Sequence, residues 1–459
     1  MVGAAPAGQV QRRFLIEQSR MTDNREPVRV GILGLGVVGG GTYSVLTRNA
    51  DEIARRAGRR IVVTTVAERD VAKARARVGA DVRIEQDAFA VVRDPNIDIV
   101  VELIGGVTVA RELVLEAIAN GKHVVTANKA LLAQYGNEIF ARAREKDVNV
   151  AFEAAVAGGI PIIKAIREGL TANRIDWVAG IINGTTNYIL TEMRTRGMSF
   201  EEALADAQRL GYAEADPTFD IEGVDAAHKL TLLASMAFGI PVQFSRAYIE
   251  GISQLSGTDV RHAEDMGYRI KLLGITRRRP EGIELRVHPT LVPANRLIAN
   301  VEGPMNAVLV HGDAVGPTLY YGQGAGEEPT ASAVVADIVD VTRLLTADPG
   351  HRVPYLAFQP EALADLPILD IGDVRSCYYL RLEVIDRPGV MADIARILAD
   401  NSISIRSMVQ DPDGVDGTAE IVFVTHEALE ADVNRAIEQM QALETVKSDV
   451  VRLRMEQLA

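Results

Sequence analysis

The stretch Val28-Arg-Val-Gly-Ile-Leu-Gly-Leu-Gly-Val-Val-Gly39 decides the fold of the first part of the chain. It begins with a short apolar run, which predicts a buried strand. The glycines at 34, 36 and 39 follow the spacing G-x-G-x-x-G, and a helical pattern then runs to about Arg56. In a first strand-to-helix turn this spacing favours dinucleotide binding, and a plain glycine turn is the alternative.

The three glycines have different expected roles. Gly34 would permit the tight turn, Gly36 would let the backbone approach a pyrophosphate, and Gly39 would let helix and strand pack closely. The helix N-terminus would offer free N–H groups and its positive dipole end to the phosphates. We therefore expect the cofactor to be bound by Gly34, Leu35, Gly36, Val37, Val38 and Gly39.

The end of the second predicted strand, 61–66, bears on which cofactor is used. It is followed by Ala67-Glu-Arg-Asp70, where an acid would hold a ribose hydroxyl and an arginine would take the 2′-phosphate of NADP. Arg69 tips the prediction slightly toward NADP, whereas Glu68 favours NAD. A solvated charge cluster is a third interpretation, so the choice between NADP and NAD stays open.

Strands and helices alternate through this part of the chain. Further strands are predicted at 97–104, 123–126 and 148–152, and a helix at 112–120. This alternation predicts an α/β fold, a Rossmann-type doubly wound parallel sheet with helices on both faces. We assign this dinucleotide-binding domain to 27–152, completed by 322–345, after a disordered extension at 1–26 in which Met21 is an alternative start.

Two further domains are predicted. Residues 153–321 combine strand signals with long helices, including 200–210 and its capping box Ser199-Phe-Glu-Glu202, and predict an α+β catalytic and dimerisation domain. A linker at 346–376 leads to a regulatory domain at 377–459, where the order βαββαβ is the ferredoxin-like plan.

Composition argues against several classes of protein. The chain has 459 residues and a formal net charge of −13, which argues against nucleic-acid or anionic-membrane partners. No apolar run reaches the roughly 18 residues of a membrane span. The single cysteine, Cys377, cannot form an intrachain disulfide, which fits a reducing, cytoplasmic location.

Only eight of the 49 lysine and arginine residues are lysines, and two of these lie in settings that favour chemistry. Lys129 follows a predicted strand end, at the edge where α/β sheets bind ligands. Lys229 follows Asp225 by four residues in an apolar helical segment, so the two side chains share a face and can pair. The pair could trade a proton with a carbonyl or hydroxyl group, and a structural ion pair is the alternative.

A loop dense in carboxylates precedes that helix. Its acids include Glu214, Asp216 and Asp220, which could bind a substrate ammonium group. The alternative is a solvated loop at the helix entry, with Asp216 and Asp220 as caps, and composition alone favours it.

Seven motifs in this order resemble those of homoserine dehydrogenases, over about residues 28–345. They are Gly34-Leu-Gly-Val-Val-Gly39, Thr126-Ala-Asn-Lys129, Phe152-Glu-Ala-Ala-Val-Ala-Gly-Gly-Ile-Pro161, Ile182-Asn-Gly-Thr-Thr-Asn-Tyr188, Tyr212-Ala-Glu-Ala-Asp-Pro217, Asp220-Ile-Glu-Gly-Val-Asp-Ala-Ala-His-Lys229 and Gly324-Ala-Gly-Glu-Glu-Pro-Thr-Ala-Ser-Ala333. The turn Asp386-Arg-Pro-Gly-Val390 resembles that of an ACT domain, a module that commonly binds amino acids.

The resemblance implies reversible NAD(P)H-dependent reduction of L-aspartate 4-semialdehyde to L-homoserine, in threonine, methionine and isoleucine biosynthesis. Lys229 would give the proton to the aldehyde, and Asp225 would support it. Glu214 would hold the amino group of homoserine, in the loop that ends at Asp220.

Cofactor and cation contacts are implied as well. Lys129 would lie near the nicotinamide and the substrate, and Gly326 would contact the cofactor. The family also has a monovalent cation site, with sodium expected, and the matching oxygens belong to the Glu153 carboxylate and the carbonyls of Val156, Gly158 and Ile160. Oxygen ligands suit a hard cation, although this segment by itself favours a flexible strand-to-helix turn.

The sequence departs from the usual family pattern at two places, and two alternative functions compete with this interpretation. Glu68 stands where many relatives have an uncharged residue, and the segment 295–299 lacks the usual His-Pro. The rivals are another dehydrogenase on the same scaffold and a catalytically inactive sensor that binds a dinucleotide and an amino acid. Intact Asp225 and Lys229 favour the enzyme. Because no aspartate-kinase domain precedes these motifs, the resemblance is to the monofunctional form.

For the tail we expect feedback control by L-threonine at the Pro388-Gly389 turn of paired ACT domains. A strand-to-helix turn can present N–H groups to a carboxylate. A purely oligomerising domain is the alternative. Paired ACT sheets predict a homo-oligomer, a dimer or a tetramer.

Overall fold

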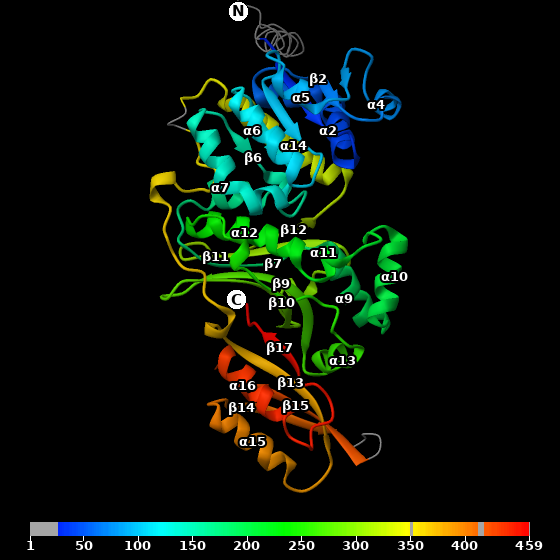
Figure 1. The fold of residues 1–459 in the computed structure, drawn as a ribbon, viewed down its shortest axis with the longest axis vertical. Helices are drawn as coiled ribbons and strands as arrows, with labels where there is room; N and C mark the ends of the chain where they lie inside the picture. Colours follow the sequence, from blue (N-terminus) through cyan, green and yellow to red (C-terminus); the bar gives the residue numbers. More distant parts are fainter. Residues whose placement is uncertain (1–25, 349–351, 412–416, 459) are drawn as a thin grey trace, which may run out of the picture. The chain divides into compact units, whose positions relative to one another are not determined.

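The computed structural model describes residues 26–348, 352–411 and 417–458, which form two compact units (Figure 1). One unit comprises the chain up to Thr171 together with Gly322–Leu363, and the other comprises Ala172–Tyr321 together with the chain from Ala364 onward. Apart from Glu26, the predicted extension at 1–26 lies outside the described residues. Within the described ranges, no helix combines the length and apolarity needed to cross a membrane.

The first unit is built on a six-stranded sheet in which all neighbouring strands pair in parallel. The strand order β3-β2-β1-β4-β5-β6 is that of the dinucleotide-binding fold, and it confirms the predicted fold class. The strands are β1 Val28–Leu33, β2 Ile61–Ala67, β3 Arg83–Glu85, β4 Ile99–Glu102, β5 His123–Thr126 and β6 Val150–Ala151. The short edge strand β3 escaped prediction because it has no apolar run.

Helices cover this sheet, and the predicted helix from Val37 to about Arg56 is divided at Asn49. The helices are α2 Val37–Arg48, α3 Ala50–Ala57, α4 Val71–Arg77, α5 Ala88–Arg93, α6 Thr108–Ala119, α7 Lys129–Glu145, α8 Ile162–Lys164 and α14 Glu327–Leu344. Apolar residues of α2, α3 and α14 form one core with those of the strands. A π-helical turn at Ala165–Gly169 and 3₁₀ turns at Glu153–Ala155 and Pro360–Ala362 complete the unit.

The second unit contains one sheet of 11 strands. Its main path runs β12-β11-β7-β9-β10-β17-β13-β15-β14, with β8 beside β10 and β16 beside β13. The strands are β7 Ile175–Ile181, β8 Tyr248–Ile249, β9 Tyr268–Arg278, β10 Ile283–Pro293, β11 Met305–Gly312, β12 Gly316–Gln323, β13 Arg375–Ile385, β14 Ile405–Asp411, β15 Thr418–Thr425, β16 Ala428–Leu429 and β17 Val451–Met455.

A nearly fully buried helix, α12, packs against β7, β9 and β10 of this sheet (Figure 1). The predicted capping box of Ser199 and Glu202 opens the helix over 200–210. The helices are α9 Gly184–Arg196, α10 Phe200–Leu210, α11 Thr218–Ile221, α12 Val224–Phe238, α13 Gly257–Asp265, α15 Val390–Asp400 and α16 Glu430–Gln441. Short 3₁₀ turns lie at Phe244–Arg246, Ile298–Asn300 and Ile371–Asp373.

The tail has the predicted βαββαβ order, with α15 and α16 sharing one core with its strands. Its sheet is not separate. The last strand, β17, pairs in parallel with β10, placing Thr290 opposite Arg454 and Leu291 opposite Met455. This junction could not be predicted from the sequence, because no local pattern marks a pairing between strands more than 150 residues apart.

Candidate active site

Four strands of the first unit end at one edge of its sheet. The register places Leu33 opposite Ala67 on one side and opposite Glu102 on the other, and it places Glu102 opposite Thr126. This carboxyl edge is where open α/β sheets bind their ligands. A cavity of about 770 Å³ lies there, lined by the glycine loop, the end of β2 and residues 103–109.

The glycine loop has the geometry that a dinucleotide requires. Gly34 has a φ of +88°, a conformation that favours glycine. A Cβ on Gly39 would lie 2.1 Å from the carbonyl oxygen of Gly34, so this packing allows no side chain. A Cβ on Gly36, the N-cap residue of α2, would meet no atom of the described residues within 4 Å, which leaves room for a pyrophosphate at the helix N-terminus.

Glu68 and Arg69 both line the cavity, but they are placed differently. The Glu68 side chain folds back over the loop, and its Oε2 accepts a hydrogen bond of 3.1 Å from the Leu35 N–H. Its Oε1 accepts the Arg69 N–H at 2.9 Å. Glu68 is half-buried, whereas Arg69 is exposed. The carboxylate is therefore the group fixed at the end of β2, where a ribose would lie.

Glu102 links the ends of neighbouring strands by hydrogen bonds, and no sequence pattern marked it for this role. It is fully buried, and its Oε1 accepts the N–H groups of Ile104 and Gly105 at 3.0 and 3.1 Å. Its Oε2 accepts the Thr126 hydroxyl at 2.7 Å. The predicted Lys129 is the first residue of α7, so it lies at this same edge.

The second unit carries the predicted pair on α12. Lys229 and Asp225 are 8% and 3% exposed, and Lys229 Nζ lies 2.6 Å from Asp225 Oδ2. Nζ also donates to the carbonyl of Ile182 at 2.7 Å. The predicted pairing is thus present, in a setting where a charge is costly unless it is paired.

Asn183 completes this cluster, and the sequence analysis gave it no individual role. Its Oδ1 caps α9 by accepting the Thr186 N–H at 2.9 Å, so its Nδ2 must face the other way. That Nδ2 donates to Asp225 Oδ2 at 2.9 Å and to Asp220 Oδ1 at 2.7 Å. One amide therefore orients both carboxylates.

Asp220 belongs to the cluster and is not a helix cap. Its Oδ2 accepts the Thr185 hydroxyl at 3.2 Å. Burial, together with the neighbouring Asp225, raises the pKa of Asp220. Asp216, by contrast, accepts the Thr218 N–H at the start of α11, although Pro217 is the N-cap residue of that helix. Glu214 is exposed, and its backbone carbonyl accepts a hydrogen bond from Gln208.

The predicted cation ligands lie around a strained turn in the first unit. Ala157 and Gly158 have φ values of +55° and +52°. The Glu153 carboxylate accepts the N–H groups of Ile163 and Lys164, both at 2.9 Å. Burial raises the pKa of Glu153 to about 7. No group of three or more His, Cys, Asp or Glu side chains in the described residues could hold a metal ion, so a site here depends on backbone carbonyls.

Two other predicted residues open helices. Gly326 is the N-cap residue of α14, in the loop whose Gly324 carbonyl would lie 2.4 Å from a Cβ on Gly158. The loop at 324–326 and the expected cation turn are therefore neighbours within the first unit. In the tail, Gly389 is the N-cap residue of α15 with a φ of +99°, and Pro388 and Gly389 are both exposed.

Comparison with known proteins decides the family. The model described as "Homoserine dehydrogenase" matches residues 161–339, "Homoserine dehydrogenase, NAD binding domain" matches 34–153, and "ACT domain" matches 378–445. A homoserine dehydrogenase of Pseudomonas aeruginosa is 63% identical over 434 residues, which are 94% of this chain and all of the relative. The chain belongs to the homoserine dehydrogenase family.

Solved structures of this family agree. A homoserine dehydrogenase from Thiobacillus denitrificans superposes with a TM-score of 0.91 at 67% identity, covering 95% of this chain and 99% of the other. A hyperthermophilic archaeal homoserine dehydrogenase in complex with NADPH has a TM-score of 0.59 at 25% identity, covering 69% and 98%. The chain is therefore an NAD(P)-dependent oxidoreductase whose tail is an ACT domain.

Proposed function

We propose that the chain catalyses the reversible reduction of L-aspartate 4-semialdehyde to L-homoserine, and that Lys229 supplies the proton. The observation that carries this proposal is the buried ion pair of Lys229 with Asp225, at 2.6 Å on α12. A lysine can change its charge when buried, whereas an arginine cannot, so this position suits proton transfer.

The reaction requires one hydride and one proton. A nicotinamide cofactor, when bound, would supply the hydride to the aldehyde carbon. Lys229 would give its proton to the carbonyl oxygen, and Asp225, held by Asn183, would keep the ammonium in place. In the reverse direction the neutral amine takes the proton back from the hydroxyl group.

Carboxylates in the segment before α12 suit the ammonium group of the substrate. We assign Glu214 and Asp220 to that role, and Lys129 to the region between substrate and nicotinamide. Asp220 has the better support because it already shares Asn183 with Asp225. The support for Glu214 is its exposed position in the loop between α10 and α11.

The glycine loop from Gly34 to Gly39, together with Gly326, would hold the cofactor. The fixed carboxylate of Glu68 supports NADH, because a 2′-phosphate would meet a negative charge there. The NADPH complex of the archaeal relative and the exposed Arg69 support NADPH. We propose that both cofactors are accepted, with NADH preferred.

A monovalent cation, sodium, is proposed at Glu153 and the carbonyls of Val156, Gly158 and Ile160. A second buried carboxylate supports it, since Asp337 Oδ2 accepts the Glu153 N–H at 2.7 Å. Burial, together with nearby Glu153, raises the pKa of Asp337 well above its usual value. A bound cation would favour the ionised form of these carboxyl groups, which burial otherwise disfavours.

For the tail we propose feedback control by L-threonine at Pro388 and Gly389, in a homo-oligomer that is a dimer or a tetramer in the cytoplasm. The ACT domain match and the exposed N-terminus of α15 support an amino-acid ligand. The enzyme would then respond to an end product of the biosynthetic route that homoserine feeds.

One assay tests the proposed function. The protein is mixed with L-aspartate 4-semialdehyde and with NADH or NADPH, and loss of the absorbance of the reduced cofactor is followed while threonine is titrated. Oxidation of either cofactor with formation of homoserine is the expected result. If neither cofactor is oxidised although calorimetry shows that the dinucleotide binds, the chain is the catalytically inactive sensor instead.

A further inference from the structure

A second buried lysine, Lys271 of β9, contacts α9, the helix that Asn183 caps. Lys271 is 2% exposed. Its Nζ donates to the carbonyl of Val301 at 2.6 Å and to Asn187 Oδ1 at 3.2 Å. Burial lowers the pKa of Lys271 to about 8. Neither the sequence motifs nor the proposed chemistry uses this residue.

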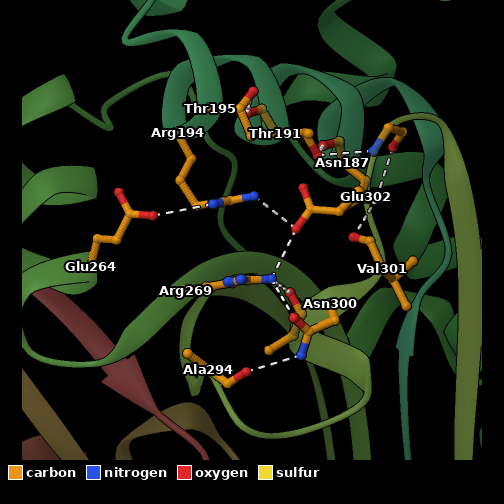
Figure 2. A network of polar contacts seen from close by, with 12 residues as sticks. Asn187, Thr191, Arg194, Thr195, Glu264, Arg269, Ala294, Asn300, Val301 and Glu302 are labelled. Atoms are coloured by element: carbon orange, nitrogen blue, oxygen red, sulfur yellow. Dashed lines mark hydrogen bonds and ion pairs between the residues drawn. The ribbon is translucent and has the colours of Figure 1, made fainter.

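Asn187 links Lys271 to the loop at 301–305. Its Nδ2 donates to three carbonyls, those of Val301, Gly303 and Met305, at 3.1, 2.8 and 3.2 Å. These acceptors fix the orientation of the amide, because only its Oδ1 can then face the ammonium group. Figure 2 shows Asn187 beside Val301, between α9 and the loop that carries Val301.

The two asparagines of the motif Asn183-Gly-Thr-Thr-Asn187 bind different partners at the start of α9. Asn183 is the N-cap residue of α9, and Asn187 lies in the first turn of that helix. The Asn187 N–H also donates to the Asn183 carbonyl at 3.4 Å. Asn187 holds the loop at 301–305, and Asn183 holds Asp225.

Charged residues surround Lys271 without replacing its contacts. Glu302 accepts hydrogen bonds from Arg194 at 2.9 Å and Arg269 at 3.0 Å (Figure 2). Arg194 also reaches Glu264 at 3.1 Å. The cluster therefore holds the end of the loop at Glu302, whereas the first turn of α9 is held through Lys271 and Asn187.

We infer that Lys271 is a positioning residue for the reaction: through Asn187 it sets the first turn of α9, and hence places Asn183 against Asp225 beside Lys229. Stability alone does not account for a cation at this position, because replacing buried ionic groups by apolar ones of similar size is often neutral or stabilising. A buried charge with fixed acceptors specifies one arrangement. The inference rests on the proposed role of Lys229.

Lys271→Met is the direct test, because methionine keeps the length of the side chain and removes the charge. We expect kcat to fall about tenfold to a hundredfold, the effect of a small misplacement at a reacting centre. The KM for NADH should stay within about twofold, since the cofactor loop belongs to the other unit. Thr195→Val is the matched control: it removes a 2.8 Å hydrogen bond from the Thr195 hydroxyl to the Thr191 carbonyl of the same helix without removing a contact of Lys271 or Asn187, and should keep kcat.

A double-variant cycle distinguishes positioning from a general structural role. If Lys271 acts through Asn183, then Lys271→Met combined with Asn183→Ala should lose no more kcat than Asn183→Ala alone. Additive losses, or a Lys271→Met variant that keeps kcat, would overturn the inference. Should Lys271→Met fail to fold, Asn187→Ser, which keeps the cation, enters the same cycle. An inactive wild-type protein would instead contradict the proposed function.

Discussion

Arg454 and Glu250 form an ion pair of 2.9 Å that joins β17 of the tail to the segment after β8. Arg454 is fully buried on β17, and Glu250 directly follows β8. Two residues beyond Glu250, the Ile252 N–H donates to the carbonyl of Ile221, the neighbour of Asp220. A displacement of β17 therefore has a short covalent and hydrogen-bonded route to the carboxylate cluster.

We predict that Glu250→Gln weakens this coupling. Although burial alone would raise it, the pKa of Glu250 is lowered, because the Arg454 charge stabilises the carboxylate. The neutral amide should leave kcat without threonine within about twofold, while inhibition by threonine falls severalfold, the size of a typical coupling free energy of 1 to 3 kcal/mol. Steady-state rates with a threonine titration measure the effect, and Glu264→Gln is a control on another surface of the same unit. Unchanged inhibition would show that the signal takes another route.

Removal of the proposed proton donor should abolish most of the activity. Lys229→Met is expected to lower kcat by about 10²- to 10⁴-fold, the usual contribution of a positioned acid or base. It leaves Asp225 without its cation, so the free energy of unfolding should also fall. Calorimetric affinity for NADH should not change, since the glycine loop is untouched. Lys447→Met, at an exposed lysine of the tail, controls for the loss of a lysine.

Cofactor choice should respond to the two residues after β2. Glu68→Gln keeps a hydrogen-bonding group but removes the charge, and we expect the NADPH to NADH ratio of kcat/KM to rise about tenfold, since a like charge about 4 Å away costs about 1 to 4 kcal/mol. Arg69→Ala should lower the same ratio. Glu52→Gln, on the surface of α3, is the control. If neither substitution changes the NADPH to NADH ratio of kcat/KM, the 2′-phosphate must bind elsewhere.

Cation binding should depend on pH through Glu153. Because its pKa is raised to about 7, the folded protein keeps this carboxyl protonated below that pH, and its ionisation destabilises the fold as the pH rises toward and through 7. A cation that binds the carboxylate should therefore stabilise the protein at pH 8 and much less at pH 6. Thermal unfolding in sodium chloride against N-methylglucamine chloride, at equal ionic strength, measures the difference. In Glu153→Gln the sodium effect should be absent at both pH values.

Local sequence patterns predicted those features that depend only on residues close together in the sequence. The spacing of Gly34, Gly36 and Gly39 predicted the turn, and the four-residue spacing of Asp225 and Lys229 predicted their pairing. Both features depend on a few neighbouring residues, whose geometry follows from a strand end or a helical turn.

Long-range contacts could not be derived in this way. Asn183 meets Asp225 over a separation of 42 residues, and the Lys271 to Asn187 contact spans 84. Neither contact has a periodic signature, because both depend on how helices lie across the sheet. The notable signal was chemical: a lysine in the apolar run of β9, in a chain with few lysines, marks a position that needs a charge.

The pairing of β10 with β17 makes the ACT domain an integral part of the second unit. Arg286 of β10 is 1% exposed, and its guanidinium reaches Glu456 at 2.5 Å. Excision of the tail would leave that guanidinium short of a partner and would expose the edge of a long strand, an arrangement prone to aggregation. The tail is therefore not an interchangeable module, because β10 and Arg286 depend on its contacts, and a stable truncated form would need a redesigned β10.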